Sequence, residues 1–189
     1  MKVLVVNNNT AHMKNLLGAL EGHEVEIQNY LPGINFHTDG KDVIVLSGGG
    51  GEGLEVNDNY KPGHPWYQDE MNLVRTATKP VVGICMGFEV MVRAFGGKVT
   101  GIGQLIQGFN KVEVSDFAYP LVGEKNLEQF ESHSWRVKEE DVPEQFQKLA
   151  KSDIGVEIIK YNNLIATQFH PEKGGTLKLQ DLLDIVVAA

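Results

Sequence analysis

The sequence predicts a single α/β domain over residues 1–189, a three-layer fold with helices flanking a mostly parallel central sheet, flavodoxin-like in the broad sense. Two observations predict it. Short valine-rich apolar runs without polar alternation indicate strands buried on both faces, as in parallel sheets. These runs alternate with segments of helical spacing, and no break in composition marks a second domain.

The first half of the chain supplies most of the expected parallel strands. "KVLVV" indicates the first buried strand, and the spacing of Leu16, Leu17 and Leu20 predicts the helix that follows it. A later helix is expected to end before Pro80, because the residue before a proline disfavours helical geometry. The expected strands are 2–6, 23–30, 42–47 and 80–85, and the expected helices are 12–22, 66–78 and 86–97.

The second half looks different, because its strand candidates are short and separated by turns. "KVTGIG", "FNKVEV" and "ESHSWRV" predict a small antiparallel excursion beside the main sheet. "VPEQFQKLAKS" is expected to form a short helix or a turn. "VEIIKY" and "LIATQFH" predict a hairpin across Asn162 and Asn163, since asparagine tolerates the left-handed turn conformation. "LKLQDLLDIVVAA" predicts a closing amphipathic helix.

The loop from Gly48 to Pro65 is long and polar. Loops of this length in compact domains are often functional lids, or else disordered. The sequence leaves both interpretations open.

Net charge, the length of the apolar segments and the cysteine count limit which partners and which cellular compartment are expected. The formal net charge is −8 and the pI about 5.2, which argues against a nucleic acid or an anionic membrane surface as the main partner. No segment approaches the roughly 20 apolar residues of a membrane helix, and the N-terminal apolar run is too short for a signal peptide. The single cysteine excludes an internal disulfide and a cysteine-based metal site. We therefore expect a cytoplasmic protein.

That cysteine, Cys85, lies in "VVGICMGF", where an apolar strand runs directly into a helix. Gly83 and Gly87 give the pattern G-x-C-x-G, the cysteine form of a nucleophile elbow. Glycines suit such a turn because side chains there would collide with neighbouring backbone. The helix N-terminus is expected to lower the thiol pKa. The alternative is that Cys85 is a small buried hydrophobe, as most free cysteines are.

A nucleophilic cysteine needs a base, and the best candidate is His170 in "LIATQFHPEK". On an extended segment residues i and i+2 point the same way, so Glu172 is placed to orient the His170 ring. The H-P-E sequence alone would equally suit a surface turn. Both Cys85 and His170 follow strands, however, and the carboxyl ends of parallel strands are where sites form.

An acyl intermediate also requires an oxyanion hole. The glycine turn in "VLSGGGGEG" offers exposed backbone N–H groups, with the Met86 N–H as a second donor. The alternative is a phosphate-binding loop, but no Gly-Lys-Ser/Thr follows these glycines.

With these residues assembled, the chain resembles the class I glutamine amidotransferase family. Three motifs carry the resemblance, in the family's order and at about its spacing, over most of the chain: "LSGGG" at Leu46–Gly50, "GICMGFE" at Gly83–Glu89 and "QFHPEK" at Gln168–Lys173.

The resemblance implies that Cys85 attacks the side-chain amide of L-glutamine and forms a γ-glutamyl thioester. His170 would act as general acid and base, Glu172 would orient it, and Gly49 and the Met86 amide would form the oxyanion hole. The ammonia would pass to a partner synthetase subunit. No metal or organic cofactor is expected for this half-reaction.

The sequence indicates the amidotransferase subtype less specifically than it indicates the family. "ESHSWRV" and the residues after it look like the corresponding region of GMP synthase amidotransferases, so Ser134 and Trp135 become candidates for binding glutamine, largely through backbone. Gly50, in the glycine turn, is a further candidate. His133 has the alternative of being an ordinary edge-strand histidine.

Two positions depart from the family's pattern. Glu89 stands where the family usually has glutamine, one helical turn after Cys85. Its carboxylate could bind the substrate α-ammonium, and it would oppose thiolate formation. The run of four glycines from Gly48 replaces the more usual proline after two glycines; this predicts an oxyanion loop ordered only when a partner docks, and low glutaminase activity in isolation.

Two alternatives from other functional classes stay open. "GFE" and "HPEK" also resemble the γ-glutamyl hydrolases, which share the fold and cleave γ-glutamyl peptides. The chain could also be a non-catalytic binding relative that keeps the fold, although Cys85, His170 and Glu172 are all present.

Overall fold

The structure is a computed structural model that describes residues 1–49 and 66–188. Its strands join into one curled sheet in the order β2-β1-β3-β4-β9-β8-β7-β5-β6. The strands are β1 (Lys2–Asn8), β2 (Glu24–Asn29), β3 (Val43–Gly49), β4 (Val81–Ile84), β5 (Thr100–Val114), β6 (Asn126–Arg136), β7 (Gln147–Lys151), β8 (Val156–Tyr161) and β9 (Leu164–Thr167). The helices are α1 (Met13–Ala19), α2 (Gln68–Thr76), α3 (Met86–Ala94), α4 (Tyr119–Val122) and α5 (Leu179–Val187), with the short 3-10 turns η1 (Glu139–Asp141) and η2 (Pro171–Lys173).

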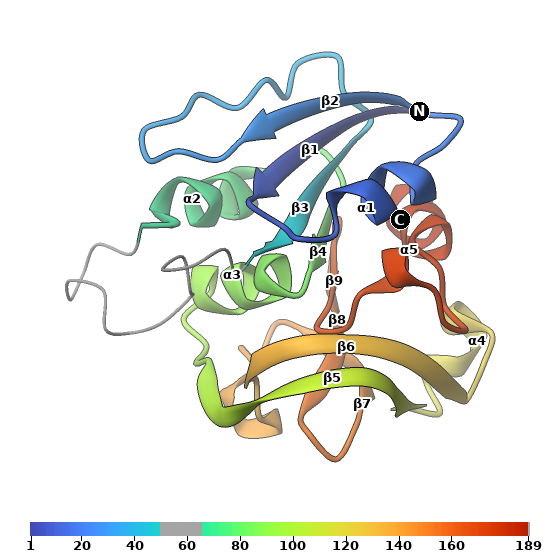
Figure 1. The fold of residues 1–189 in the computed structure, drawn as a ribbon. Helices are drawn as coiled ribbons and strands as arrows, with labels where there is room; N and C mark the ends of the chain where they lie inside the picture. The colour runs from blue at the N-terminus through green and yellow to red at the C-terminus, as the bar shows by residue number, and fades with distance from the viewer. Residues whose placement is uncertain (50–65, 189) are drawn as a thin grey trace.

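Helices cover both faces of the parallel part of the sheet, in which β2, β1, β3, β4 and β9 pair in parallel (Figure 1). Successive side chains of β1 enter two separate cores. Leu4 packs in one cluster with Phe88 of α3, and Val3 packs in the other with Leu16 of α1 and Leu183 of α5. These strands are continuous apolar runs in the sequence because they are buried on both faces. The predicted three-layer α/β fold is confirmed.

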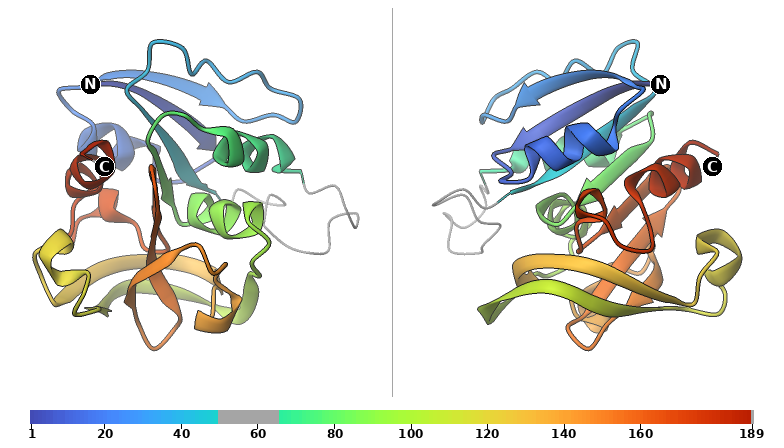
Figure 2. Two further views of the ribbon diagram at one scale, coloured as in Figure 1. Left: turned by 180° about the vertical axis from the view of Figure 1, so that it is seen from behind. Right: turned by 45° about the vertical axis from the view of Figure 1, so that its right-hand side comes forward.

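The antiparallel part is larger than the small excursion expected from the sequence. β8, β7, β5 and β6 extend the sheet by antiparallel pairing, and the long β5–β6 ribbon curls across one end of the molecule (Figures 1 and 2). The two short candidates at 98–103 and 109–114 are in fact one strand, β5, with an irregular register between Gly101 and Ile106. Its glycines resemble turn signals, but Gly101 and Gly108 pair with β6 and only Gly103 lies in the irregular stretch.

The expected helix or turn at 142–152 was wrong over its second half, which forms β7. Leu149 and Ala150 of this strand are buried between β5 and β8, so tertiary burial decides the conformation. The hairpin of β8 and β9 is confirmed, with Asn162 at a φ of 49° in its turn. Within residues 1–49 and 66–188, no helix is long and apolar enough to cross a membrane.

Candidate active site

Cys85 occupies the sharp turn between β4 and α3. Its backbone has φ 51° and ψ −102°, a conformation that costs energy in a non-glycine residue. Two main-chain hydrogen bonds hold the turn: the Cys85 N–H donates to the Thr167 carbonyl at 2.8 Å, and the Glu89 N–H donates to the Cys85 carbonyl at 3.1 Å. The strained nucleophile turn expected from G-x-C-x-G is therefore present.

The two flanking glycines are required by close backbone packing. A Cβ added at Gly83 would lie 2.7 Å from the carbonyl carbon and oxygen of Gly87, and one added at Gly87 would lie 2.6 Å from the carbonyl oxygen of Leu46. Either side chain would push α3 away from the strands that position Cys85.

His170 and Glu172 form a hydrogen-bonded pair directly after β9. The Nδ1 atom of His170 lies 2.8 Å from Oε1 of Glu172, and both side chains are buried. The main-chain N–H of His170 also donates to the Phe130 carbonyl at 2.8 Å, and this bond joins the segment to β6. Among the described residues, His170 Nε2 has no hydrogen-bond partner, so this nitrogen is available for proton transfer.

Gly48, at the end of β3, brings the two halves of the site together. A Cβ added there would lie 3.0 Å from Cε1 of His170 and 3.6 Å from Cβ of Cys85. The thiol-bearing turn and the imidazole thus approach the same glycine from two sides, at the carboxyl ends of β3, β4 and β9.

The next glycine packs directly on the residue after the cysteine. A Cβ at Gly49 would overlap the sulfur of Met86 and would lie 3.3 Å from the Met86 Cβ, so the two residues are in close contact. The two expected oxyanion donors are therefore neighbours in space. Asn8 and Ser47 support the turn from behind: the Asn8 N–H donates to Ser47 Oγ at 2.9 Å, and Ser47 Oγ donates to the Gly48 carbonyl at 2.7 Å. Gly50 and the rest of the long polar loop lie outside the described residues.

The thiol itself is held in its neutral form, contrary to the expectation that the helix N-terminus would lower its pKa. Burial raises the pKa of Cys85 well above its ordinary value, and the charges of Glu89 and Glu172 raise it further. The backbone N–H of Met86 acts in the lowering direction but is outweighed. The resting thiol is therefore protonated, and it donates a long hydrogen bond of 3.9 Å to the Ser132 carbonyl.

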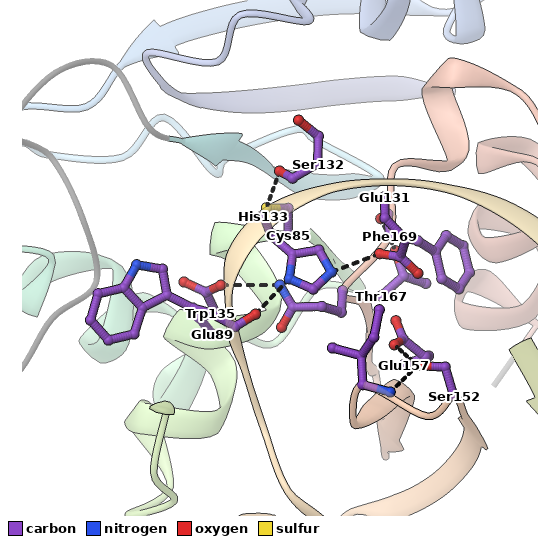
Figure 3. A network of polar contacts seen from close by, with 12 residues as sticks. Cys85, Glu89, Glu131, Ser132, His133, Trp135, Ser152, Glu157, Thr167 and Phe169 are labelled. Carbon is purple, nitrogen blue, oxygen red and sulfur yellow. Dashed lines mark hydrogen bonds and ion pairs between the residues drawn. The ribbon is translucent and has the colours of Figure 1, made fainter. Parts of the chain in front are cut away.

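Glu89 lies buried on α3, where the sequence placed it (Figure 3). Its Oε1 atom accepts a hydrogen bond of 3.0 Å from Nε2 of Gln168, the first residue of "QFHPEK". The carboxylate is thus fixed between the cysteine helix and the histidine segment.

Of the "ESHSWRV" residues, Ser132 accepts the hydrogen bond from the Cys85 thiol, through its carbonyl. Ser134 and Trp135 lie farther along β6; the Trp135 ring packs over Gly101, where an added Cβ would be 3.3 Å from the ring. The Trp135 carbonyl accepts from Nδ1 of His133 at 2.5 Å, so His133 is part of a buried network and not a free edge-strand side chain.

Sequence reasoning missed His12, which precedes α1. Its ring meets that of His170 edge-on, with centroids 4.8 Å apart at 80°. Partial burial lowers the pKa of His12, and its electrostatic interactions with His170 and Lys173 lower that pKa further. No motif in the sequence marks His12, because its contact with His170 is made only by folding.

Three fully buried glutamates were also missed: Glu70 on α2, Glu131 on β6 and Glu157 on β8. Burial raises the pKa of both Glu70 and Glu157 to about 8. The signal in the sequence was weak, because glutamates on helices and strands normally face solvent.

Comparison with known proteins gives one family. The family model described as "Glutamine amidotransferase class-I" matches residues 4–187. The imidazole glycerol phosphate synthase subunit HisH of Staphylococcus aureus (strain Mu50) is 25% identical over 200 residues, which is 95% of this chain and 94% of that protein. A glutamine-hydrolysing GMP synthase subunit of Archaeoglobus fulgidus is 33% identical over 138 residues, 70% of this chain and 68% of its own length.

Solved structures agree on the fold. A Thermoplasma acidophilum protein assigned as a GMP synthase subunit superimposes with a TM-score of 0.79 at 23% identity, covering all of this chain and 92% of that one. A glutamine amidotransferase from Thermotoga maritima gives a TM-score of 0.71 at 17% identity, with 91% and 76% covered. At these identities the likeness supports the fold alone.

Proposed function

The chain belongs to the class I glutamine amidotransferase family, and from this premise we propose that it hydrolyses the side-chain amide of L-glutamine through a thioester on Cys85 and supplies the ammonia to a synthase subunit. The observation that carries the proposal is the placement of the imidazole. His170 uses Nδ1 for Glu172, leaves Nε2 unpartnered among the described atoms, and approaches Gly48 together with Cys85.

The proposed first step starts from the neutral thiol. The Cys85 proton passes to His170 Nε2 as sulfur attacks the amide carbon, and the negative oxygen is held by the N–H groups of Gly49 and Met86. The C–N bond then breaks, and His170 returns the proton to the leaving nitrogen, which departs as ammonia. Glu172 stabilises the transient imidazolium through the 2.8 Å hydrogen bond to Nδ1.

In the second step water attacks the γ-glutamyl thioester. His170 takes a proton from the water, the C–S bond breaks, and the proton returns to sulfur. Glutamate and the free thiol result, so the reaction consumes one glutamine and one water and needs no oxidant or reductant.

Covalent labelling tests this proposal. The protein is exposed to 6-diazo-5-oxo-norleucine, a reactive glutamine analogue, and the intact mass is measured beside Cys85→Ala. We expect one adduct on the parent protein and none on the variant, together with glutamate release from glutamine. Absence of the adduct, both alone and with a synthase subunit present, would exclude the proposed chemistry.

For the acceptor we propose GMP synthase, because the sequence around His133 resembles those amidotransferases and the relative with 33% identity is a GMP synthase subunit. The similarity to HisH makes imidazole glycerol phosphate synthase the competing acceptor. Each synthase subunit from the same genome is added in turn, and a rise in glutaminase activity with only one of them identifies the partner.

A second candidate is a γ-glutamyl hydrolase, favoured by the carboxylate of Glu89 in place of the usual glutamine. A γ-glutamyl peptide is assayed beside glutamine, and turnover of the peptide alone would favour the hydrolase. Glutamine binding without adduct or turnover would instead favour a non-catalytic relative.

A further inference from the structure

Behind the thiol lies a buried network of three ionisable side chains, Glu131, His133 and Glu157 (Figure 3). Glu131 and His133 are two residues apart and lie on the same face of β6. Glu157 faces them from β8. All are at most 4% exposed. Nε2 of His133 lies 2.8 Å from Oε2 of Glu131, and Oγ of Ser152 donates to Oε1 of Glu157 at 2.6 Å.

Hydrogen-bond geometry fixes the protons on the histidine. Both ring nitrogens of His133 face acceptors, the Trp135 carbonyl at 2.5 Å and the Glu131 carboxylate at 2.8 Å. When Oε2 of Glu131 carries no hydrogen, both bonds form only if both ring nitrogens carry one, which makes the ring an imidazolium. Burial opposes this charge, but the hydrogen bond to Glu131 and the charges of Glu131 and Glu157 outweigh it and raise the pKa of His133.

The two glutamates also require a proton. Oε1 of Glu131 and Oε2 of Glu157 are buried with no other partner among the described residues, and the two carboxyl groups lie within hydrogen-bonding reach of each other. A proton on Oε2 of Glu157, donated to Oε1 of Glu131, satisfies both atoms. Burial and the charge of Glu131 favour this state, because together they raise the pKa of Glu157 to about 8.

This network holds the strand that faces the catalytic residues. The His133 ring binds the Trp135 carbonyl, two residues ahead of it on the same strand. Between Phe130 and Trp135, β6 presents one carbonyl to the His170 N–H and another to the Cys85 thiol. A change in the charge of the network therefore acts on the backbone that lines the thiol.

We propose that Glu157 is a positioning residue: it keeps one proton shared with Glu131, which locks the His133 imidazolium onto the Trp135 carbonyl and holds residues 132–135 in place to bind glutamine. This inference rests on the proposed function. Its consequence is that glutamine binding weakens at alkaline pH, when the shared proton is lost and two buried carboxylates face each other.

The charged groups around the network explain why losing the shared proton is expected to weaken glutamine binding. From β6 Glu157 faces Glu131 and His133, and from the β4–α3 turn the Cys85 thiol lies within electrostatic reach of Glu131. Glu89 on α3 adds a further negative charge near the same thiol. Only His133 is positive among them, so a second carboxylate charge is not neutralised locally.

The test compares the parent with Glu157→Gln. Glutamine keeps both hydrogen bonds, since its amide oxygen accepts from Ser152 and its amide nitrogen donates to Glu131, but it cannot ionise. With a pKa of about 8, about nine-tenths of the parent is protonated at pH 7 and slightly less than one-tenth at pH 9, so the KM for glutamine is expected to rise about tenfold. In Glu157→Gln this rise is expected to disappear.

Glu70→Gln is the matched control, because Glu70 is another buried glutamate whose pKa is raised to about 8 but it lies on α2, bonded to Asn8. The alkaline rise in KM is expected to persist in this variant. The proposal would be overturned if the KM of Glu157→Gln rose at alkaline pH as much as that of the parent. It would also be overturned if the alkaline rise in KM disappeared only in Glu70→Gln.

Difference infrared spectroscopy reads the proton without any turnover. In the Glu70→Gln background, the carbonyl stretch of the protonated Glu157 carboxyl is expected to vanish as pH rises through about 8. It is expected to be absent from the double variant with Glu157→Gln. If this signal is missing in the single variant, the shared proton is refuted. If the signal is found but Cys85 takes no adduct and glutamine is not turned over, the proposed function fails while the shared proton stands.

Discussion

The side-chain amide of Gln168 donates a 3.0 Å hydrogen bond to the carboxylate of Glu89, and this fixes a negative charge one helical turn beyond Cys85. The pair joins the two motifs that supply the nucleophile and the base. It also explains how a carboxylate is accommodated at a position where the family usually has an amide, since the glutamine of "QFHPEK" turns its donor toward it.

Replacing this carboxylate with an amide is expected to make the thiol more reactive. The charge of Glu89 raises the pKa of Cys85, so Glu89→Gln lowers that pKa and increases the thiolate fraction at pH 8. Because the thiolate is the form that is alkylated, we expect faster alkylation of Glu89→Gln than of the parent. The rate of iodoacetamide labelling across pH measures it, with Glu21→Gln, an exposed glutamate, as the control. Equal labelling rates in both variants would contradict the prediction.

Removing the charge that orients His170 is expected to reduce kcat. Glu172→Gln keeps the shape of the side chain but cannot stabilise the imidazolium, so we expect a fall of about 10²- to 10⁴-fold. Steady-state glutamate release measures kcat at saturating glutamine. Glu128→Gln, an exposed glutamate on β6, is the control. A kcat within twofold of the parent would remove Glu172 from the catalytic machinery.

Two glycine-to-alanine substitutions are expected to change stability in opposite directions. At Gly18 in α1 an added Cβ meets no atom within 4 Å, so Gly18→Ala should raise the free energy of unfolding by about 0.5–1 kcal/mol. At Gly87 the added Cβ would lie 2.6 Å from the Leu46 carbonyl oxygen. We expect Gly87→Ala to lower the free energy of unfolding by about 1–3 kcal/mol. Urea denaturation measures both, and a stabilising Gly87→Ala would refute the packing argument.

The buried carboxyl of Glu70 is expected to make stability fall as pH rises. Its pKa is raised from 4.5 to about 8, first by burial and then by the charge of Asp69, against the lowering effect of the Asn8 hydrogen bond. Between these two values the folded state binds the proton and the unfolded state does not, so the free energy of unfolding decreases through this window.

Glu70→Gln should remove that slope. Relative to the variant, the parent is expected to lose about 1.4 kcal/mol for each pH unit between about pH 5 and pH 8, and no more above it. Urea denaturation at each pH gives the two curves. Parallel curves would show that Glu70 is ionised in the folded state.

The order of the elements and the catalytic triad candidates could be predicted from the sequence, because local signals carry them. Apolar runs indicate the strands around β3 and β4. The glycines around Cys85 reflect close backbone packing, since a Cβ added at Gly87 would lie 2.6 Å from the Leu46 carbonyl oxygen. Strands β5 and β7 could not be predicted from the sequence. Glycines inside β5 resemble turn signals, and β7 forms because Leu149 is buried between the neighbouring strands.

Electrostatics could be predicted only in part. The opposing charge of Glu89 follows from its spacing to Cys85, but the dominant effect on the thiol is burial, which a sequence does not display. The contact of His12 with His170 and the meeting of Glu131 with Glu157 join residues far apart in the chain, and only the folded sheet brings them together.

The contacts through which β6 reaches the catalytic residues are made by main-chain oxygens, those of Phe130 and Ser132. Every amino acid carries the same carbonyl, so alanine scanning along this strand would leave both contacts intact and understate the strand's contribution. Amide-to-ester replacement, which weakens a chosen carbonyl acceptor, would expose it. The contribution of this strand to the site is therefore carried by its backbone, at the thiol of Cys85 and at the main-chain N–H of His170.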